Sequence, residues 1–193
     1  MNTSPQQLTQ RRQKTRQVFI NALVRLVIER GYDHITVTDI ANEANYGRWA
    51  FYQYFDSKEA VAWAAFEEWM GQLDRHVVEA VGHLASPQRE YESWRILIGA
   101  FHQQLPFFAR LGSIAESVWR VRAKELLVGQ FLHHLQAGQF ALMEGVRPEI
   151  AARLYVAAFM ELLETWVAHP EMGDANALAD EFFTFIFNQP PIP

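Results

Sequence analysis

The chain has 193 residues, of which half are hydrophobic, and a formal net charge of −5. That length is enough to bury a substantial core. The absence of cysteine excludes a disulfide framework, a cysteine-based zinc site and thiol catalysis, and suits a reducing cytoplasm. No uncharged stretch reaches the length of a membrane span, so we expect a cytoplasmic protein that does not cross a membrane.

The charge is unevenly distributed along the chain. Residues 1–60 carry eight Lys and Arg against six Asp and Glu, whereas residues 61–193 carry nine against sixteen. The basic residues gather further near the amino terminus, at Arg11, Arg12, Lys14 and Arg16. Such a cluster is typical of a solvated tail or of a local positive patch that contacts phosphates.

Helices are predicted from the amino terminus onward. The first should run from about Thr9 to Arg30, because apolar residues recur on one face and Gly31 follows as a C-cap. A second should begin at Val37, since Thr36 and Asp39 have the spacing of a capping box. It should end near Ala44, before a turn of only a few residues.

A third helix follows the turn, with Gly47 as its N-cap. Phe51 and Phe55 are one helical turn apart and should pack inward. The side chains left facing outward suit base edges in the major groove. They are Arg48, Trp49, Ala50, Gln53 and Tyr54. Two short helices joined in this way are a helix-turn-helix.

The order T-x-x-x-I-A, a short turn, then Y-x-x-F-x-S-K resembles the DNA-binding domain of the TetR family of transcriptional regulators. The resemblance covers roughly the first third of the chain and implies a dimer that binds a pseudo-palindromic double-stranded operator. We expect base contacts from Arg48, Trp49 and Gln53. The resemblance implies mainly phosphate contacts for Thr36, Tyr52, Tyr54 and Lys58.

Residues 57–193 are expected to form a helical-bundle body for effector binding and dimerisation, behind a DNA-binding domain at 1–56. Helical periodicity and turn signals predict a helix from Asp56 or Ser57 to about Leu84, and another from Ser86-Pro87 to about Leu105, where Pro106 interrupts. Further helices are predicted at 106–113, from there to about Met143, at 148–169 and at 174–188. The fold class is therefore all-α, with a three-helix head, a bundle body and about nine helices.

The body is richer in large rings than a bundle of this size needs, which suggests a cavity for a small apolar or aromatic effector. Plain core packing is the competing explanation. The candidate lining residues are Trp94, Phe101, Phe107, Trp119, Phe131, Phe159 and Trp166, with His102 and Glu161 as polar anchors.

The last two helices are the candidate homodimer interface. One carries a stripe of small and apolar residues, and the other is apolar nearly all round, so it must be buried. The residues are Ala151, Leu154, Ala158, Leu162, Phe182, Phe183 and Ile186. These rings could instead fill the protomer's own core. In TetR-like proteins an analogous four-helix bundle joins two subunits.

Enzymatic chemistry finds no support in the sequence. There is no Gly-rich phosphate loop, no nucleophile elbow and no metal-ligand pattern, so we expect no cofactor and no metal. The leading hypothesis is a repressor that a ligand releases from DNA. A regulator of the same shape that is controlled by a protein partner, or by nothing, is an alternative. An all-α enzyme or carrier with a helix-turn-helix-like hairpin is another.

Overall fold

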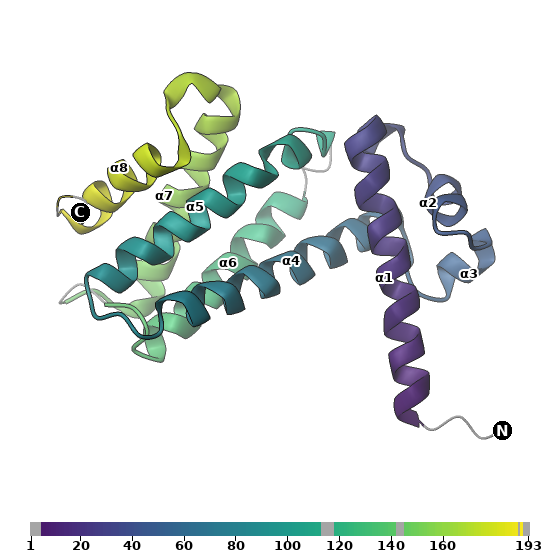
Figure 1. Cartoon of the computed structure of the whole chain (residues 1–193), viewed down its shortest axis with the longest axis horizontal. Coiled ribbons are helices and arrows are strands. Elements are labelled where there is room, and N and C mark those ends of the chain that lie inside the picture. Colours follow the sequence, from purple (N-terminus) through teal and green to yellow (C-terminus); the bar gives the residue numbers. More distant parts are fainter. Residues whose placement is uncertain (1–4, 113–117, 142–144, 189, 191–193) are drawn as a thin grey trace. The chain divides into compact units, whose positions relative to one another are not determined.

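The fold is all-α, as predicted. The computed structural model describes residues 5–112, 118–141, 145–188 and 190, and within them it contains eight α-helices, two short 3-10 helices and no strand (Figure 1). The α-helices are α1 (Pro5–Arg30), α2 (Val37–Glu43), α3 (Arg48–Tyr52), α4 (Lys58–Val81), α5 (Gln88–Phe108), α6 (Val118–Gln136), α7 (Pro148–Ala168) and α8 (Ala175–Phe187). The 3-10 helices are η1 (Tyr32–His34) and η3 (Pro170–Met172).

The prediction of a helix break at Pro106 is wrong. Helix α5 continues through Pro106 to Phe108, although proline removes one helical hydrogen bond and crowds the preceding turn. Pro106 lies two residues before the last residue of α5. The ring of Phe108 packs 5.7 Å from that of Trp69 on α4. The separate helix expected at 106–113 is therefore the end of α5, which explains one helix fewer than expected; residue 113 lies outside the described residues.

Helix α6 ends earlier than predicted. It stops at Gln136 rather than near Met143, which lies outside the described residues. Gly138 has φ +69, and its N–H donates to the carbonyl of Leu135 at 3.2 Å. A glycine in this left-handed conformation is a common helix terminator, so the signal was present in the sequence.

The chain divides into two compact units. The head unit comprises residues 1–71 and 106–116, and the body unit comprises residues 72–105 and 117–193. Helix α4 contributes to both units, as does α5. The domain boundary expected at residue 57 remains a prediction, because a unit of contacts need not be a unit of function.

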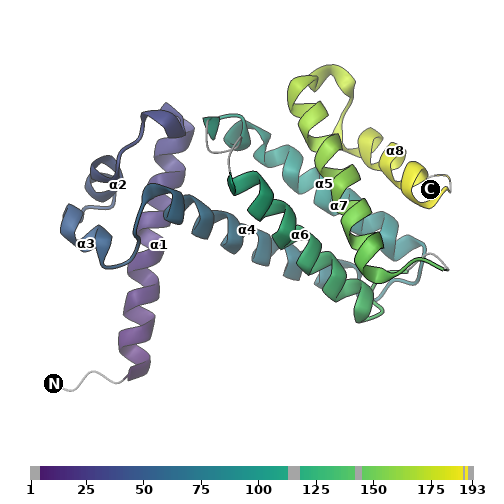
Figure 2. The same ribbon diagram turned by 180° about the vertical axis from the view of Figure 1, so that it is seen from behind.

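The head unit is built on α1, with α2 and α3 beside it in both views (Figures 1 and 2). Phe19 of α1 is fully buried. Its ring lies 5.4 Å from that of Phe51 and 6.4 Å from that of Phe55, in both cases edge to face. Such pairs add to the stabilisation that burial already gives. Both phenylalanines are buried, as predicted, and Phe51 fixes α3 to α1.

The segment after α5 packs onto the same head unit. The carbonyl of Arg110 accepts the N–H of Tyr32 at 2.9 Å. Gly112 has φ +53, and a Cβ there would lie 2.1 Å from an Asp33 carboxylate oxygen. Only glycine fits both the backbone conformation and this close approach.

The body unit has an aromatic core that four helices share. The ring of Trp94 on α5 lies 5.2 Å from Phe131 of α6, 5.6 Å from Phe159 of α7 and 4.6 Å from Phe182 of α8. All four side chains are buried. Helices α6 and α7 lie side by side in both views (Figure 2), so a single ring cluster holds α5 to α8 together.

Candidate functional site

The helix-turn-helix begins with a capping box. The Thr36 hydroxyl accepts the N–H of Asp39 at 3.2 Å, and the Asp39 carboxylate accepts the N–H of Thr36 at 2.8 Å. The hydrogen bonds from Thr36 lower the pKa of Asp39. Two free N–H groups at the start of α2 are thus satisfied reciprocally, and the predicted helix start at Val37 is confirmed.

The turn between α2 and α3 has the predicted backbone. Asn45 adopts the left-handed conformation with φ 58, and the N–H of Tyr46 donates to the carbonyl of Ala41 at 2.9 Å. Gly47 is the N-cap of α3. The turn therefore fixes the angle at which α3 leaves α2.

Three of the predicted reading residues lie on α3, and Gln53 and Tyr54 follow its end. Trp49 is 77% exposed, although it is one of the largest apolar side chains. Arg48, Tyr52 and Gln53 are exposed as well, whereas Ala50 and Tyr54 are half-buried. An exposed tryptophan beside an arginine and a glutamine, on a helix anchored by buried phenylalanines, is suited to contact a partner.

Arg48 is held by a neighbour on its own helix. Its guanidinium donates to the Tyr52 hydroxyl at 3.3 Å and lies 5.6 Å from the centre of that ring. The pair is separated by one helical turn, where side chains meet. Both groups remain exposed, so Tyr52 orients the guanidinium without covering it.

Two arginines of α1 donate to backbone carbonyls at the carboxyl-terminal end of α3. These contacts were not predicted from the sequence. Arg12 donates to the carbonyl of Gln53 at 3.5 Å, and Arg16 donates to the carbonyl of Tyr54 at 3.2 Å. The Arg16 guanidinium also lies 4.3 Å from the centre of the Phe55 ring. Cations favour the carbonyl end of a helix, so these side chains position α3 rather than act only as phosphate contacts.

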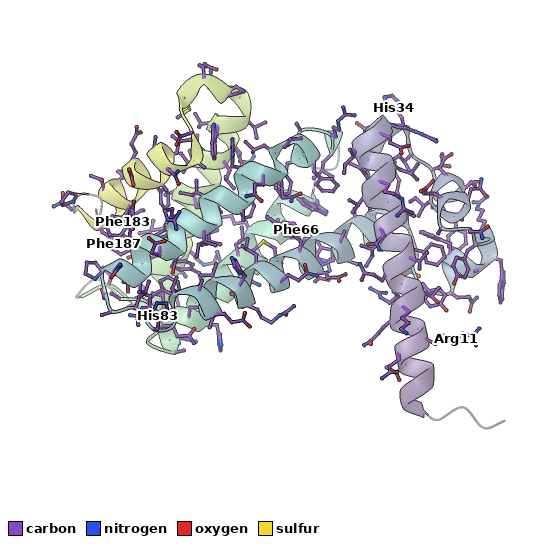
Figure 3. All side chains as sticks on the ribbon, viewed as in Figure 1. Arg11, His34, Phe66, His83, Phe183 and Phe187 are labelled. Atoms are coloured by element: carbon purple, nitrogen blue, oxygen red, sulfur yellow. The ribbon has the colours of Figure 1, made fainter. Side chains whose placement is uncertain are left out.

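A hollow separates the amino-terminal half of α1 from α3. It is a shallow, open hollow of about 460 Å³, lined by Arg11, Arg12, Tyr46, Trp49, Ala50, Gln53 and Tyr54. We call these residues, with Arg48 and Tyr52, the reading surface. Figure 3 labels Arg11 on this half of α1. The surface combines cations for phosphates with amide, guanidinium and aromatic groups for bases.

The family resemblance implies a phosphate contact for Lys58, but in this structure its ammonium contacts the protein's own backbone. Its ammonium donates to the carbonyls of Tyr32 at 3.2 Å and Ile35 at 3.0 Å. It also lies 4.2 Å from the centre of the Tyr32 ring. Lys58 thus fastens the start of α4 to the segment before α2.

We expect Lys58→Met to destabilise the head by roughly 1–3 kcal/mol, because two buried carbonyls would lose a charged donor. Thermal unfolding measures this loss. The matched control is Lys14→Met, because the Lys14 side chain of α1 is exposed. This substitution should leave stability unchanged and flatten the salt dependence of DNA binding. Unchanged stability of Lys58→Met with a flatter salt dependence would instead support the phosphate contact first expected.

The predicted effector residues do not form one group. Trp94, Phe131 and Phe159 belong to the aromatic core, and Phe101 joins it with its ring 5.1 Å from that of Phe159. The buried Trp166 stacks on His102 at 4.4 Å.

The remaining candidates are half-buried or exposed. Phe107 belongs to the head unit and is half-buried, as is Trp119 of the body unit. His102 and Glu161 are exposed. An effector site formed by these residues remains a prediction.

The predicted dimer residues also divide into two groups. Ala151, Phe182 and Phe183 are buried within the protomer, and Phe183 stacks on Phe187 at 4.8 Å (Figure 3). Leu154 is 62% exposed, and Ala158, Leu162 and Ile186 are half-buried. Phe185 of α8, which the candidate set omits, is 77% exposed. The side chains free to contact a second copy are therefore those of the second group, together with Phe185.

No three His, Asp or Glu side chains gather in a metal-binding arrangement within the described part of the chain. None of the described helices combines the length and apolarity needed to cross a bilayer.

Comparison with known proteins agrees with this geometry. Residues 19–65 match the family model "Bacterial regulatory proteins, tetR family". This range covers the carboxyl-terminal part of α1, all of α2 and α3, and the start of α4. Over 185 residues the chain is 25% identical to the fatty acid metabolism regulator protein of Bacillus subtilis strain 168, covering 90% of this chain and 93% of that protein.

Solved structures share the fold across both units. FadR of Thermus thermophilus, a transcriptional repressor of that family solved with lauroyl-CoA, has a TM-score of 0.71 at 19% identity and covers 92% of this chain and 98% of its own. NalD of Pseudomonas aeruginosa, the secondary repressor of the MexAB-OprM multidrug efflux pump, has a TM-score of 0.59 at 19% identity, with 91% and 95% covered.

Proposed function

We propose that this chain, which belongs to the tetR family of bacterial regulatory proteins, is a dimeric transcriptional repressor that a mainly apolar effector releases from its operator. The observation that carries the proposal is the reading surface: Arg48 and Trp49 of α3 and Gln53 at its C-cap are exposed, while Phe51 of α3 packs on Phe19 of α1. That combination serves to insert a helix into a major groove.

The operator should be a pseudo-palindrome. Two copies of α3 related by a two-fold axis read half-sites about 34 Å apart, or a multiple of that distance. The exposed Leu154 of α7 and Phe185 of α8 support a dimer interface on the last two helices. Covering these exposed apolar side chains with a second copy stabilises the dimer relative to the separate protomers.

A fatty-acyl thioester is the effector class that the relatives support. The fatty acid metabolism regulator aligns over nearly the whole chain, and a repressor of the same fold was solved with lauroyl-CoA. An apolar, aromatic-rich body suits an acyl chain. Residues 61–193 carry more acidic than basic residues, so the acyl chain rather than the phosphates should supply most of the affinity.

The test is fluorescence anisotropy with a duplex from the protein's own upstream region at a fixed salt concentration. Lauroyl-CoA is expected to weaken operator binding by roughly 5- to 150-fold, the usual range of allosteric coupling, whereas CoA alone should have no effect. Operator binding that ignores every acyl-CoA would contradict the fatty-acyl effector while leaving the DNA-binding function in place. A chain that binds no duplex specifically is not a repressor.

A further inference from the structure

The body unit holds a small cavity beside the carboxyl-terminal half of α4. Its volume is about 130 Å³. Its walls are Val77, Val78, Val81 and Gly82, together with Arg89, Gln139 and Phe140. None of the residues that the sequence assigned to an effector lines it. The walls are mainly apolar, and Arg89 and Gln139 supply the polar groups.

Arg89 keeps an unused donor at this cavity. One of its terminal nitrogens donates to the Glu90 carboxylate at 3.2 Å. That carboxylate is 1% exposed and also accepts the N–H of Ala141 at 2.8 Å. The Nε–H of Arg89 is buried and meets no acceptor among the described residues. Glu90 engages a terminal nitrogen and not Nε, so the Nε–H of Arg89 remains for a second acceptor.

Gln139 is oriented by a chain of polar contacts that ends on α4. Its side-chain oxygen faces Nδ1 of His134, and Nε2 of the same ring lies 2.6 Å from the Asp74 carboxylate. The amide nitrogen of Gln139 carries two hydrogens, so at least one N–H is left for the cavity whichever end of the amide faces His134. A ligand that moves Gln139 therefore disturbs a contact made by α4.

We propose that this cavity binds a compact apolar carboxylic acid, with its carboxylate on Arg89 and Gln139 and its body among the valines and Phe140. The size fits one ring, since an engineered apolar cavity of about 150 Å³ binds benzene. The charge follows from Arg89, because a guanidinium recognises a carboxylate through two parallel hydrogen bonds. The inference rests on the proposed function and adds to it a second class of effector.

The position of the cavity gives the acid a route to the DNA-binding unit. Three valines of its wall belong to α4, and the same helix begins in the head unit at Lys58. A ligand that fits one arrangement of α4 better than another shifts the population toward it. Operator DNA and the acid should then change each other's affinity by the same factor.

The experiment is calorimetric titration of the full chain with benzoate, with benzyl alcohol as the uncharged probe of the same ring. We expect benzoate to bind about tenfold tighter or more, the contribution of a charged hydrogen bond. Arg89→Met should remove that preference. Arg95→Met is the matched control on the same helix, because Arg95 is exposed and pairs with Glu92 at 2.7 Å, and it should keep the preference.

A second variant guards against unfolding, since Arg89→Met also leaves Glu90 without its cation. Val78→Phe fills the cavity and keeps that ion pair, so it should lose benzoate binding while retaining its thermal unfolding temperature. Equal affinity for the two probes, or full benzoate binding by Val78→Phe, would overturn the inference. If lauroyl-CoA releases the operator but benzoate does not bind, the inference is overturned and the proposed repressor stands. If the chain does not bind the operator, the proposed repressor itself is contradicted.

Discussion

Replacing both Leu154 and Phe185 by Glu is expected to convert the protein into a monomer with little affinity for its operator. Leu154 is 62% exposed and Phe185 77% exposed, so the protomer does not need either side chain for its own core. Four carboxylates at a two-fold interface would repel one another and lose solvent on association. Without a dimer the two half-sites are read separately, which should cost roughly 10²- to 10⁴-fold in operator affinity.

Size-exclusion chromatography with light scattering measures the oligomeric state, and anisotropy measures operator binding. Val121→Glu is the control, because Val121 is another large apolar side chain, 64% exposed, on α6. It should remain dimeric and bind DNA normally. A double variant that still elutes as a dimer would place the interface on other helices.

The sequence predicted those parts of the head that depend on neighbours in the chain. The capping box of Thr36 and Asp39, the left-handed Asn45 and the N-cap at Gly47 each involve residues within one helical turn. Their chemistry is local, so it can be recognised before any packing is known. The outward face of α3 followed from the helical period once Phe51 was placed inside.

Contacts between distant residues escaped prediction. Arg16 donates to a carbonyl 38 positions away, and Arg12 to one 41 positions away. Nothing in the local sequence distinguishes these arginines from Arg11 or Lys14, which remain exposed. Likewise, Phe108, which ends α5 beyond Pro106, packs on Trp69 of another helix.

Helical periodicity also cannot separate a pocket wall from a core residue. Trp94 and Phe159 recur on inward faces, and in the structure they pack on each other and on Phe182. The cavity at Arg89 gathers residues from the end of α4, the start of α5 and the segment after α6. Arg89 can be recognised as a ligand-binding group only when the partners of its buried nitrogens are known. In the sequence it is one more charged residue near a helix start.

Arg48→Ala is expected to cost roughly 1–3 kcal/mol in operator binding and to relax the preference for operator over unrelated DNA. The side chain stands exposed at the first position of α3, where recognition helices contact base edges. Tyr52 holds its guanidinium from one turn away, so part of the ordering entropy is already lost in the free protein. A preoriented donor discriminates better between bases because less of its binding free energy goes into ordering.

Dissociation constants for operator and scrambled duplexes at one salt concentration separate this role from a phosphate contact. Arg25→Ala is the matched control in the head unit, because it removes the same charge from an exposed side chain that pairs with Glu43 at 2.8 Å. Losing Arg25 should affect both duplexes alike, since no base edge is involved. Losing Arg48 should weaken operator binding alone, by about 5- to 150-fold for the energies given. Equal weakening on the two duplexes would show that Arg48 contacts the DNA phosphates. Trp49 and Gln53 would then be the remaining candidates for base contacts.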